Sequence, residues 1–105
     1  MSFLGKRMLS RAKEKGIALA GLDTFNMESA QAVVTAAEEL SAAVFLQTCI
    51  RSVEHSGLAM AGRILSQAKS GARVEICTHL DHGPEPSDIE QLTQAMDAGL
   101  ESIMV

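Results

Sequence analysis

The stretch VEICTHLDHGPEPSDIEQLTQAMDAGLESIMV, residues 74–105, decides the fold because it contains one complete strand–helix–strand unit. Short apolar runs over Val74–Thr78 and Ser102–Val105 predict the two strands. The segment between them predicts a helix, which Ser87–Glu90 would open as a capping box and Gly99 would end. Its apolar positions at helical spacing are Ile89, Leu92, Ala95 and Met96. A strand, a helix and a second strand in this order are typical of a parallel sheet.

The same unit recurs upstream. Apolar runs over Ile17–Leu22 and Ala43–Thr48 predict two more strands, so that predicted strands begin at residues 17, 43, 74 and 102. A helix over Leu4–Lys15 precedes the first strand and ends at Gly16, and Asn26 is the expected N-cap of the next helix. Near-continuous hydrophobicity predicts strands that are covered on both faces. The two intervening helices are indicated by apolar residues at Met27, Ala30, Val33, Val34, Ala37 and Leu40, and at Leu58, Ala61, Ile64, Leu65 and Ala68.

Repeated βα units leave two α/β architectures open. One is an open, doubly wound sheet, and the other is the first part of a (β/α)8 barrel. Both place functional residues at the carboxyl ends of the strands. By that rule Glu101, which precedes the fourth strand, serves stability. The candidate functional residues are those that follow the first three strands, namely Asp23 and Asn26, Cys49 and Arg51, and His79, Asp81 and His82.

Composition limits the class of protein. The chain has 105 residues, of which 47% are hydrophobic and 21% charged, as expected of a single folded domain over residues 1–105. A net charge of −4 without a basic cluster argues against nucleic-acid binding. No apolar run approaches the length of a membrane span, and we expect a cytoplasmic protein. Cys49 and Cys77 form no disulfide pattern, and Cys77 is expected to be a small buried residue.

The cluster His79-Leu80-Asp81-His82 carries the strongest chemical signal. Imidazole is a good Zn²⁺ ligand, and a neighbouring carboxylate can serve as acid or base. Strand alternation places His79 and Asp81 on one side, and a turn at Gly83-Pro84 would redirect His82. The spacing alone leaves an alternative open, in which His79 is a hydrogen-bonded core residue and Asp81 caps the turn. His55, at the start of the second helix, is expected to be a solvated or capping residue.

Four segments resemble one family. They are HLDHG (79–83), AMDAGLESIMV (95–105), GIALAGLDTFNMESAQAVVTAAEELSAAVFLQTC (16–49) and EHSGLAMAGRILSQA (54–68). In this arrangement they are similar to the metal-dependent class II ketose-bisphosphate aldolases, over nearly the whole chain.

The resemblance implies a fold and a set of roles. The fold would be the N-terminal half of a TIM (β/α)8 barrel, with about four parallel strands. Asp81 would match the catalytic proton-transfer carboxylate, His82 a Zn²⁺ ligand, and His79 a supporting residue. The reaction would be reversible cleavage of a phosphorylated ketose, a ketose bisphosphate, into dihydroxyacetone phosphate and an aldehyde.

Three positions depart from the family's pattern. Asp23 stands where the family usually has Asn, Cys49 where it has Ser, and Arg51 where it has a small residue. Asp23 and Cys49 would face the substrate. A carboxylate at Asp23 would repel a phosphate group, which Arg51 could offset.

A complete barrel needs eight strands, so we expect either a homo-oligomer or a missing C-terminal half. The remaining Zn²⁺ ligands of the family would lie outside this chain. An alternative function is an inactive half-barrel that acts as an assembly or interaction module. A free-standing flavodoxin-like binding domain is a third, weaker possibility, because no loop has a phosphate-binding glycine fingerprint.

Overall fold

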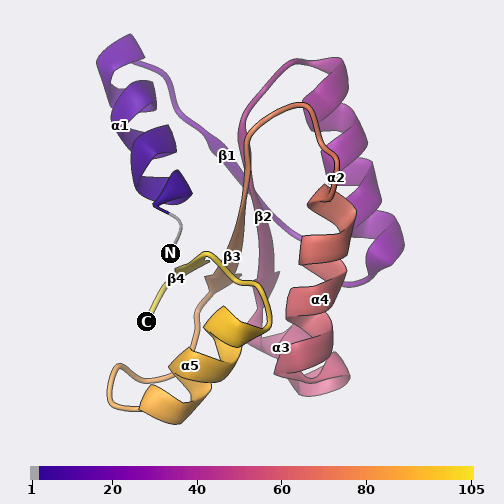
Figure 1. Ribbon diagram of the computed structural model, residues 1–105, viewed down its shortest axis with the longest axis vertical. Coiled ribbons are helices and arrows are strands. Elements are labelled where there is room, and N and C mark those ends of the chain that lie inside the picture. The colour runs from indigo at the N-terminus through magenta and orange to yellow at the C-terminus, as the bar shows by residue number, and fades with distance from the viewer. Residues whose placement is uncertain (1–2) are drawn as a thin grey trace.

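The computed structural model describes residues 3–105. Its order of one helix followed by alternating strands and helices confirms the predicted order, with one additional short helix, α3 (Figure 1). No helix in residues 3–105 is long and apolar enough to cross a membrane. The helices are α1 (Leu4–Lys15), α2 (Met27–Glu39), α3 (Ile50–Ser56), α4 (Leu58–Lys69) and α5 (Ile89–Asp97), and the strands are β1 (Ala20–Asp23), β2 (Val44–Cys49), β3 (Ile76–Asp81) and β4 (Ser102–Ile103).

The four strands form one parallel sheet in the order β1-β2-β3-β4. Each strand therefore lies beside the strand that follows it along the chain. In a doubly wound sheet the spatial order of successive strands reverses at a switch point, whereas the strands of a (β/α)8 barrel lie side by side in sequence order. The strand order thus selects the half-barrel from the two predicted α/β architectures.

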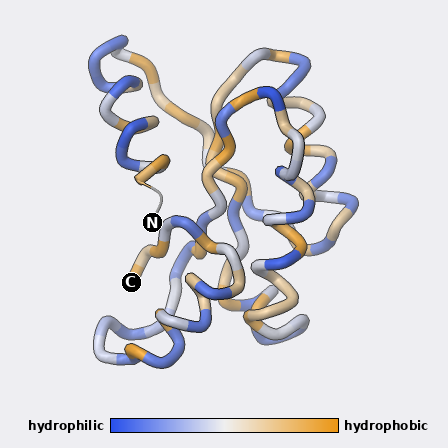
Figure 2. The backbone as a smooth tube through the Cα atoms, viewed as in Figure 1, coloured by the Kyte–Doolittle hydropathy of each residue, from blue (hydrophilic) through white to orange (hydrophobic). Residues whose placement is uncertain are grey.

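Helices α2, α4 and α5 cover one face of the sheet and form the core with it. Figure 1 shows α2 and α4 beside each other on one side of the sheet and α1 on the other side. Apolar and polar residues alternate along the chain in Figure 2, as expected of elements that bury one face. The buried core residues are Ala30, Val34, Leu46, Leu65, Ile76, Leu80, Ala95 and Leu100.

The opposite face of the sheet, here called the open face, is only partly covered. Buried and half-buried residues alternate along β2, and all four residues of β1 are exposed. The prediction that these strands are covered on both faces is therefore wrong. In the described chain β1 has one neighbouring strand, and the helix on the side of the open face is α1 (Figure 1).

Helix α1 covers the amino end of the open face. Met8 and Ala12 are buried there, and a Cβ built on Gly5 would lie 3.2 Å from Cys77 Sγ and 3.3 Å from Phe45 Cε1. Cys77 is fully buried, as predicted. Burial, and next the charge of Glu101, raise the pKa of its thiol to about 11. The thiol is therefore neutral at physiological pH.

The first three strands extend further toward their carboxyl ends than predicted, whereas β4 ends at Ile103, before the predicted Val105. Asp23, Cys49 and Asp81 are the last residues of β1, β2 and β3, and His79 lies within β3. Their prediction as residues that follow the strands is wrong by one to three positions, because polar side chains on the open face do not interrupt the ladder. At their amino ends, β1 and β3 begin later than predicted.

Capping explains where the helices begin. Asn26 forms the predicted N-cap of α2, where its side chain accepts a hydrogen bond from Ser29 N at 2.9 Å. At α5 the N-cap is Asp88, and the predicted capping box over Ser87–Glu90 is wrong. The Asp88 carboxylate accepts bonds from both Gln91 N at 3.0 Å and Gln91 Nε2 at 2.7 Å, which a serine hydroxyl in its place could not match.

Candidate functional site

The carboxyl ends of β1, β2 and β3 bring the predicted site residues to one edge of the sheet. The parallel register pairs Asp23 with Gln47 and Cys49 with Asp81. Residues paired in this way project from the same face, so Asp23, Cys49, His79 and Asp81 all lie on the open face. The register therefore brings these four candidate residues to one face of the sheet.

Four polar residues form one level across all four strands. We call Asp23, Gln47, His79 and Ser102 the polar ladder, because the register pairs each of them with the next. Gln47 Nε2 donates to Asp23 Oδ1 at 3.2 Å, and His79 Nδ1 lies 2.8 Å from Ser102 Oγ. The ladder therefore consists of two hydrogen-bonded pairs side by side.

Gln47 and Ser102 were not among the predicted site residues. Each is a polar residue in a largely apolar run. Gln47 is two residues before Cys49 on β2, so strict alternation could have identified it. Ser102 required the pairing of β3 with β4.

Glycine at position 21 makes room for the first pair. A Cβ at Gly21 would overlap Gln47 Oε1, so the Gln47 amide lies over the glycine while its nitrogen reaches Asp23. The Asp23 carboxylate is thereby held on the open face. This contact links the sequence Gly21-Leu22-Asp23 directly to the site.

His79 is held in the middle of the polar ladder. The Phe45 ring meets it edge to face, with ring centroids 6.1 Å apart and an interplanar angle of 85°. Burial lowers the pKa of His79 below its ordinary value, more than the nearby charges of Asp81 and Asp23 raise it. His79 is therefore a neutral imidazole at physiological pH.

Asp81 and His82 lie next to each other above the ladder. His82 Nε2 is 3.8 Å from Asp81 Oδ2, and the His82 side chain is 70% exposed while that of Asp81 is 22% exposed. His82 has a left-handed backbone, with φ of 52°, which turns the chain out of β3. The predicted redirection of His82 thus begins at His82 itself, before Gly83.

Cys49 lies at the junction of β2 and α3. Its Sγ is 4.0 Å from Ser52 Oγ, and Ser52 Oγ donates to Thr24 O at 3.5 Å, which joins α3 to the end of β1. Helix α3 follows Cys49 at once and carries Arg51 in its first turn. His55 lies in the last turn of α3, so its predicted place at the start of the next helix is wrong.

The described residues do not form a metal site by themselves. A catalytic zinc site normally has three protein ligands. Residues 3–105 contain no group of three or more His, Cys, Asp or Glu side chains that could hold a metal ion. His82 is exposed and chemically suitable as one ligand, but it stands without the other two.

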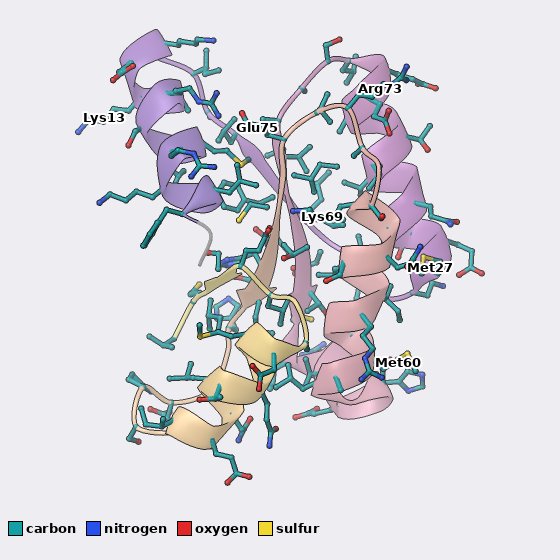
Figure 3. All side chains as sticks on the ribbon, viewed as in Figure 1. Lys13, Met27, Met60, Lys69, Arg73 and Glu75 are labelled. Carbon is teal, nitrogen blue, oxygen red and sulfur yellow. The ribbon has the colours of Figure 1, made fainter. Side chains whose placement is uncertain are left out.

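A second polar cluster lies between α4 and the sheet, at the amino end of β4. Lys69 Nζ lies 2.9 Å from Glu101 Oε2 and donates to Ile76 O at 2.7 Å, and Thr78 N donates to Glu101 Oε2 at 3.1 Å. Figure 3 shows Lys69 reaching from α4 toward the strands. This cluster ties α4, β3 and β4 together, which fits the structural role predicted for Glu101.

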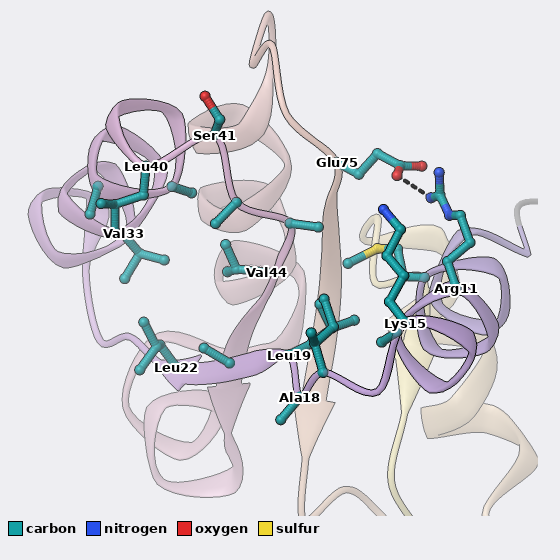
Figure 4. Close-up of a pocket in the computed structure, with 18 residues that line it drawn as sticks. Arg11, Lys15, Ala18, Leu19, Leu22, Val33, Leu40, Ser41, Val44 and Glu75 are labelled. Carbon is teal, nitrogen blue, oxygen red and sulfur yellow. Dashed lines mark hydrogen bonds and ion pairs between the residues drawn. The ribbon is translucent and has the colours of Figure 1, made fainter.

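A groove of about 570 Å³ lies at the opposite edge, where β1 and β2 begin. Apolar side chains such as Leu19, Leu22 and Val44 line it, and the Arg11–Glu75 ion pair crosses its rim (Figure 4). It contains none of the predicted site residues. The groove is therefore separate from the chemistry at the carboxyl ends of the strands.

Comparison with known proteins gives a consistent result. The family model described as fructose-bisphosphate aldolase class-II matches residues 5–105. A fructose-bisphosphate aldolase from Thermus caldophilus is 32% identical over 105 residues, which are 100% of this chain and 33% of that protein. A 6-phospho-5-dehydro-2-deoxy-D-gluconate aldolase from Halalkalibacterium halodurans is 34% identical over 95% of this chain and 35% of that protein.

A solved structure agrees with the sequence comparison. The crystal structure of a putative fructose-1,6-biphosphate aldolase from Coccidioides immitis superposes with a TM-score of 0.85 and 26% identity, over 99% of this chain and 40% of that one. The chain thus spans about a third of the length of the curated relatives it matches, as 33% and 35% coverage show. The match agrees with the half-barrel that the strand order indicates.

Proposed function

Because this chain belongs to the class II fructose-bisphosphate aldolase family, we propose that it supplies the Asp81–His82 part of an active site for reversible aldol cleavage of a phosphorylated ketose. The observation that carries the proposal is the pair itself. A half-buried carboxylate and an exposed imidazole lie 3.8 Å apart at the carboxyl end of β3. This is the end of a (β/α)8 barrel where active sites are built.

Asp81 is the proton-transfer group in this proposal. In the cleavage direction its carboxylate accepts the proton of the substrate hydroxyl that becomes the aldehyde oxygen. The O–H electron pair forms the new carbonyl, the adjacent carbon–carbon bond breaks, and its electrons pass to the ketose half as an enediolate. In the synthetic direction Asp81 returns the proton. Its partial burial excludes part of the competing water.

His82 is assigned to the metal of the proposed reaction, Zn²⁺. Its exposed side chain and outward-turned backbone leave the imidazole free to bind. Because residues 3–105 lack a complete set of ligands, the proposal requires further ligands from a second chain or from a C-terminal half. The substrate class follows from the family, whose members are named for sugar-phosphate substrates that differ from one another.

The structure also offers an observation that favours a second function, an inactive assembly module. Both outer strands of the sheet lack a second neighbouring strand within the described chain, and large apolar side chains are exposed beside them. Leu22 and Phe25 at β1 are 46% and 66% exposed, and Met104 after β4 is 43% exposed. Such edges favour association with another chain. In this case we expect a homo-oligomer without tight Zn²⁺ binding.

Calorimetric Zn²⁺ titration of the 105-residue chain, with its mass in solution measured in parallel, separates the two functions. His82→Ala is the test variant, and His55→Ala is the matched control because His55 is an exposed histidine on a different element, α3. When a second copy of the chain supplies the missing ligands, the aldolase proposal predicts Zn²⁺ binding that His82→Ala abolishes and His55→Ala leaves unchanged. Stable oligomers whose Zn²⁺ binding is absent or indifferent to His82 would establish the assembly module instead.

A further inference from the structure

The His79–Ser102 pair of the polar ladder has a directional hydrogen bond that the proposed function does not use. His79 Nδ1 lies 2.8 Å from Ser102 Oγ, and either atom could donate. The second ring nitrogen, Nε2, has no hydrogen-bond partner within residues 3–105. The imidazole is therefore held through one nitrogen while the other remains available to a ligand.

The protein partners of Ser102 within residues 3–105 favour one direction for this bond. His79 Nδ1 is the one partner of the Ser102 hydroxyl in the part of the chain that the structure describes. If Nδ1 carried the proton, the Ser102 hydrogen would have no protein acceptor. If Ser102 donates, its hydrogen is satisfied and Nδ1 is an acceptor. A neutral imidazole with an acceptor at Nδ1 carries its proton on Nε2.

The surroundings of the ring restrict what this N–H can bind. Phe45 packs edge to face against the ring, at an interplanar angle of 85°, and limits its rotation. Asp23 lies on the same level of the open face, and Asp81 lies one level above. These two carboxylates give the open face around His79 a negative potential, which disfavours a phosphate group beside the ring. A neutral oxygen remains a suitable acceptor for the Nε2 proton.

We propose that His79 is a substrate-binding residue that donates its Nε2–H to an uncharged hydroxyl or carbonyl oxygen, and that Ser102 is the positioning residue that fixes this tautomer. The inference rests on the proposed aldolase function for the identity of the ligand as a polyhydroxylated substrate. It assigns the neutral part of that substrate to the open face over β1, β2 and β3, and the phosphate to another part of the site.

Long-range ¹H–¹⁵N correlation spectra of the imidazoles test the tautomer in the 105-residue chain. His79→Gln identifies the His79 signals. The wild-type chain should show one tautomer, protonated at Nε2. Ser102→Ala should lose this single-tautomer pattern, and Ser102→Thr, which keeps the hydroxyl, should restore it. Ser66→Ala is the matched control, because it removes a hydroxyl that bonds to Gly99 O and not to a histidine.

Two results of this experiment would overturn the proposal. One is a wild-type His79 protonated at Nδ1, and the other is a tautomer that Ser102→Ala leaves unchanged. Both are independent of Zn²⁺ binding by His82, so a failure of the aldolase proposal is distinguishable from a failure of this one.

A second titration tests the ligand class. Glycerol, as a neutral polyol, and inorganic phosphate are added separately while the His79 Nε2 signal is followed. We expect a saturable shift with glycerol, a several-fold smaller shift with phosphate, and a several-fold weaker glycerol response in Ser102→Ala. A phosphate response as large as the glycerol response, or no glycerol response, would refute the assignment of His79 to a neutral oxygen.

Discussion

Replacing Glu101 by glutamine should destabilise the protein strongly, because this substitution removes the charge from a largely enclosed ion pair. The side chains of Lys69 and Glu101 are 25% and 24% exposed. Glu101 Oε2 also accepts hydrogen bonds from Thr78 N at 3.1 Å and Thr78 Oγ1 at 3.3 Å. Glutamine keeps one acceptor but directs either an uncharged oxygen or an amide group toward the Lys69 ammonium.

The magnitude follows from what the substitution removes. A hydrogen bond to a charged group contributes about 1.5–3 kcal/mol, and breaking a buried ion pair costs about 3–5 kcal/mol. Since a quarter of each side chain remains in contact with water, we expect a loss near the lower of these values, about 2–3 kcal/mol. Lys69 keeps its bond to Ile76 O at 2.7 Å, which limits the loss further.

Urea unfolding of the wild-type chain, Glu101→Gln and Glu38→Gln measures this difference. Glu38 is the matched control because it pairs with Arg73 at the same 2.9 Å distance, but the Arg73 side chain is 85% exposed. The control should cost less than about 1 kcal/mol. Equal losses for the two variants, or a Glu101→Gln loss below about 1 kcal/mol, would show that enclosure of the pair does not govern its contribution.

Three further predictions concern the fold and the site. The wild-type chain should lose stability as the pH rises from 9 toward about 11, because the raised pKa of the Cys77 thiol means that this thiol ionises first in the unfolded state. Urea unfolding at several pH values should show a loss of up to about 3 kcal/mol in the free energy of unfolding, and Cys77→Ala should lack this loss. Because folding lowers the pKa of His79, the neutral imidazole contributes to the free energy of unfolding above its ordinary pKa of 6.5, and this contribution is lost as the pH falls through the pKa of the folded state. If His79→Gln showed the same dependence of unfolding free energy on pH as the wild-type chain, this reasoning would be contradicted. Asn26→Ala should cost about 1 kcal/mol in thermal or urea unfolding because α2 loses its N-cap, whereas Asn26→Asp should keep most of the stability.

The sequence predicted the repeated βα units and the edge where the candidate site lies, because both depend on local hydrophobic spacing. It did not predict α3. Seven residues are too few for a helical period to be recognised, and the break from α4 depends on Gly57, whose φ of 82° appears only in the folded backbone. The left-handed φ of His82 could not be predicted from the sequence either. The sequence indicated only a turn, through the glycine and proline that follow His82.

The site was predicted one strand at a time, and its connections were not. His79, Asp81 and Asp23 stood out as polar residues after apolar runs. Gln47 and Ser102 could be recognised as their partners only from the strand register, which pairs Gln47 with His79 and His79 with Ser102 across neighbouring strands. Registers between parallel strands are set by how whole βα units pack, which hydrophobic spacing within one strand does not determine.

The strand order β1-β2-β3-β4 also bears on how the chain folds during its synthesis. Each strand pairs with the one made just before it, so a newly emerging βα unit finds its docking surface already formed. Within residues 3–105 every strand pairs with a strand adjacent to it in the sequence, which keeps the sequence separation between paired strands short and the entropy cost of loop closure low. β1 is the first strand to emerge, and all four of its residues remain exposed after β2 has paired with it. Growth of the sheet from the amino end thus gives assembly a direction, from β1 outward along the chain.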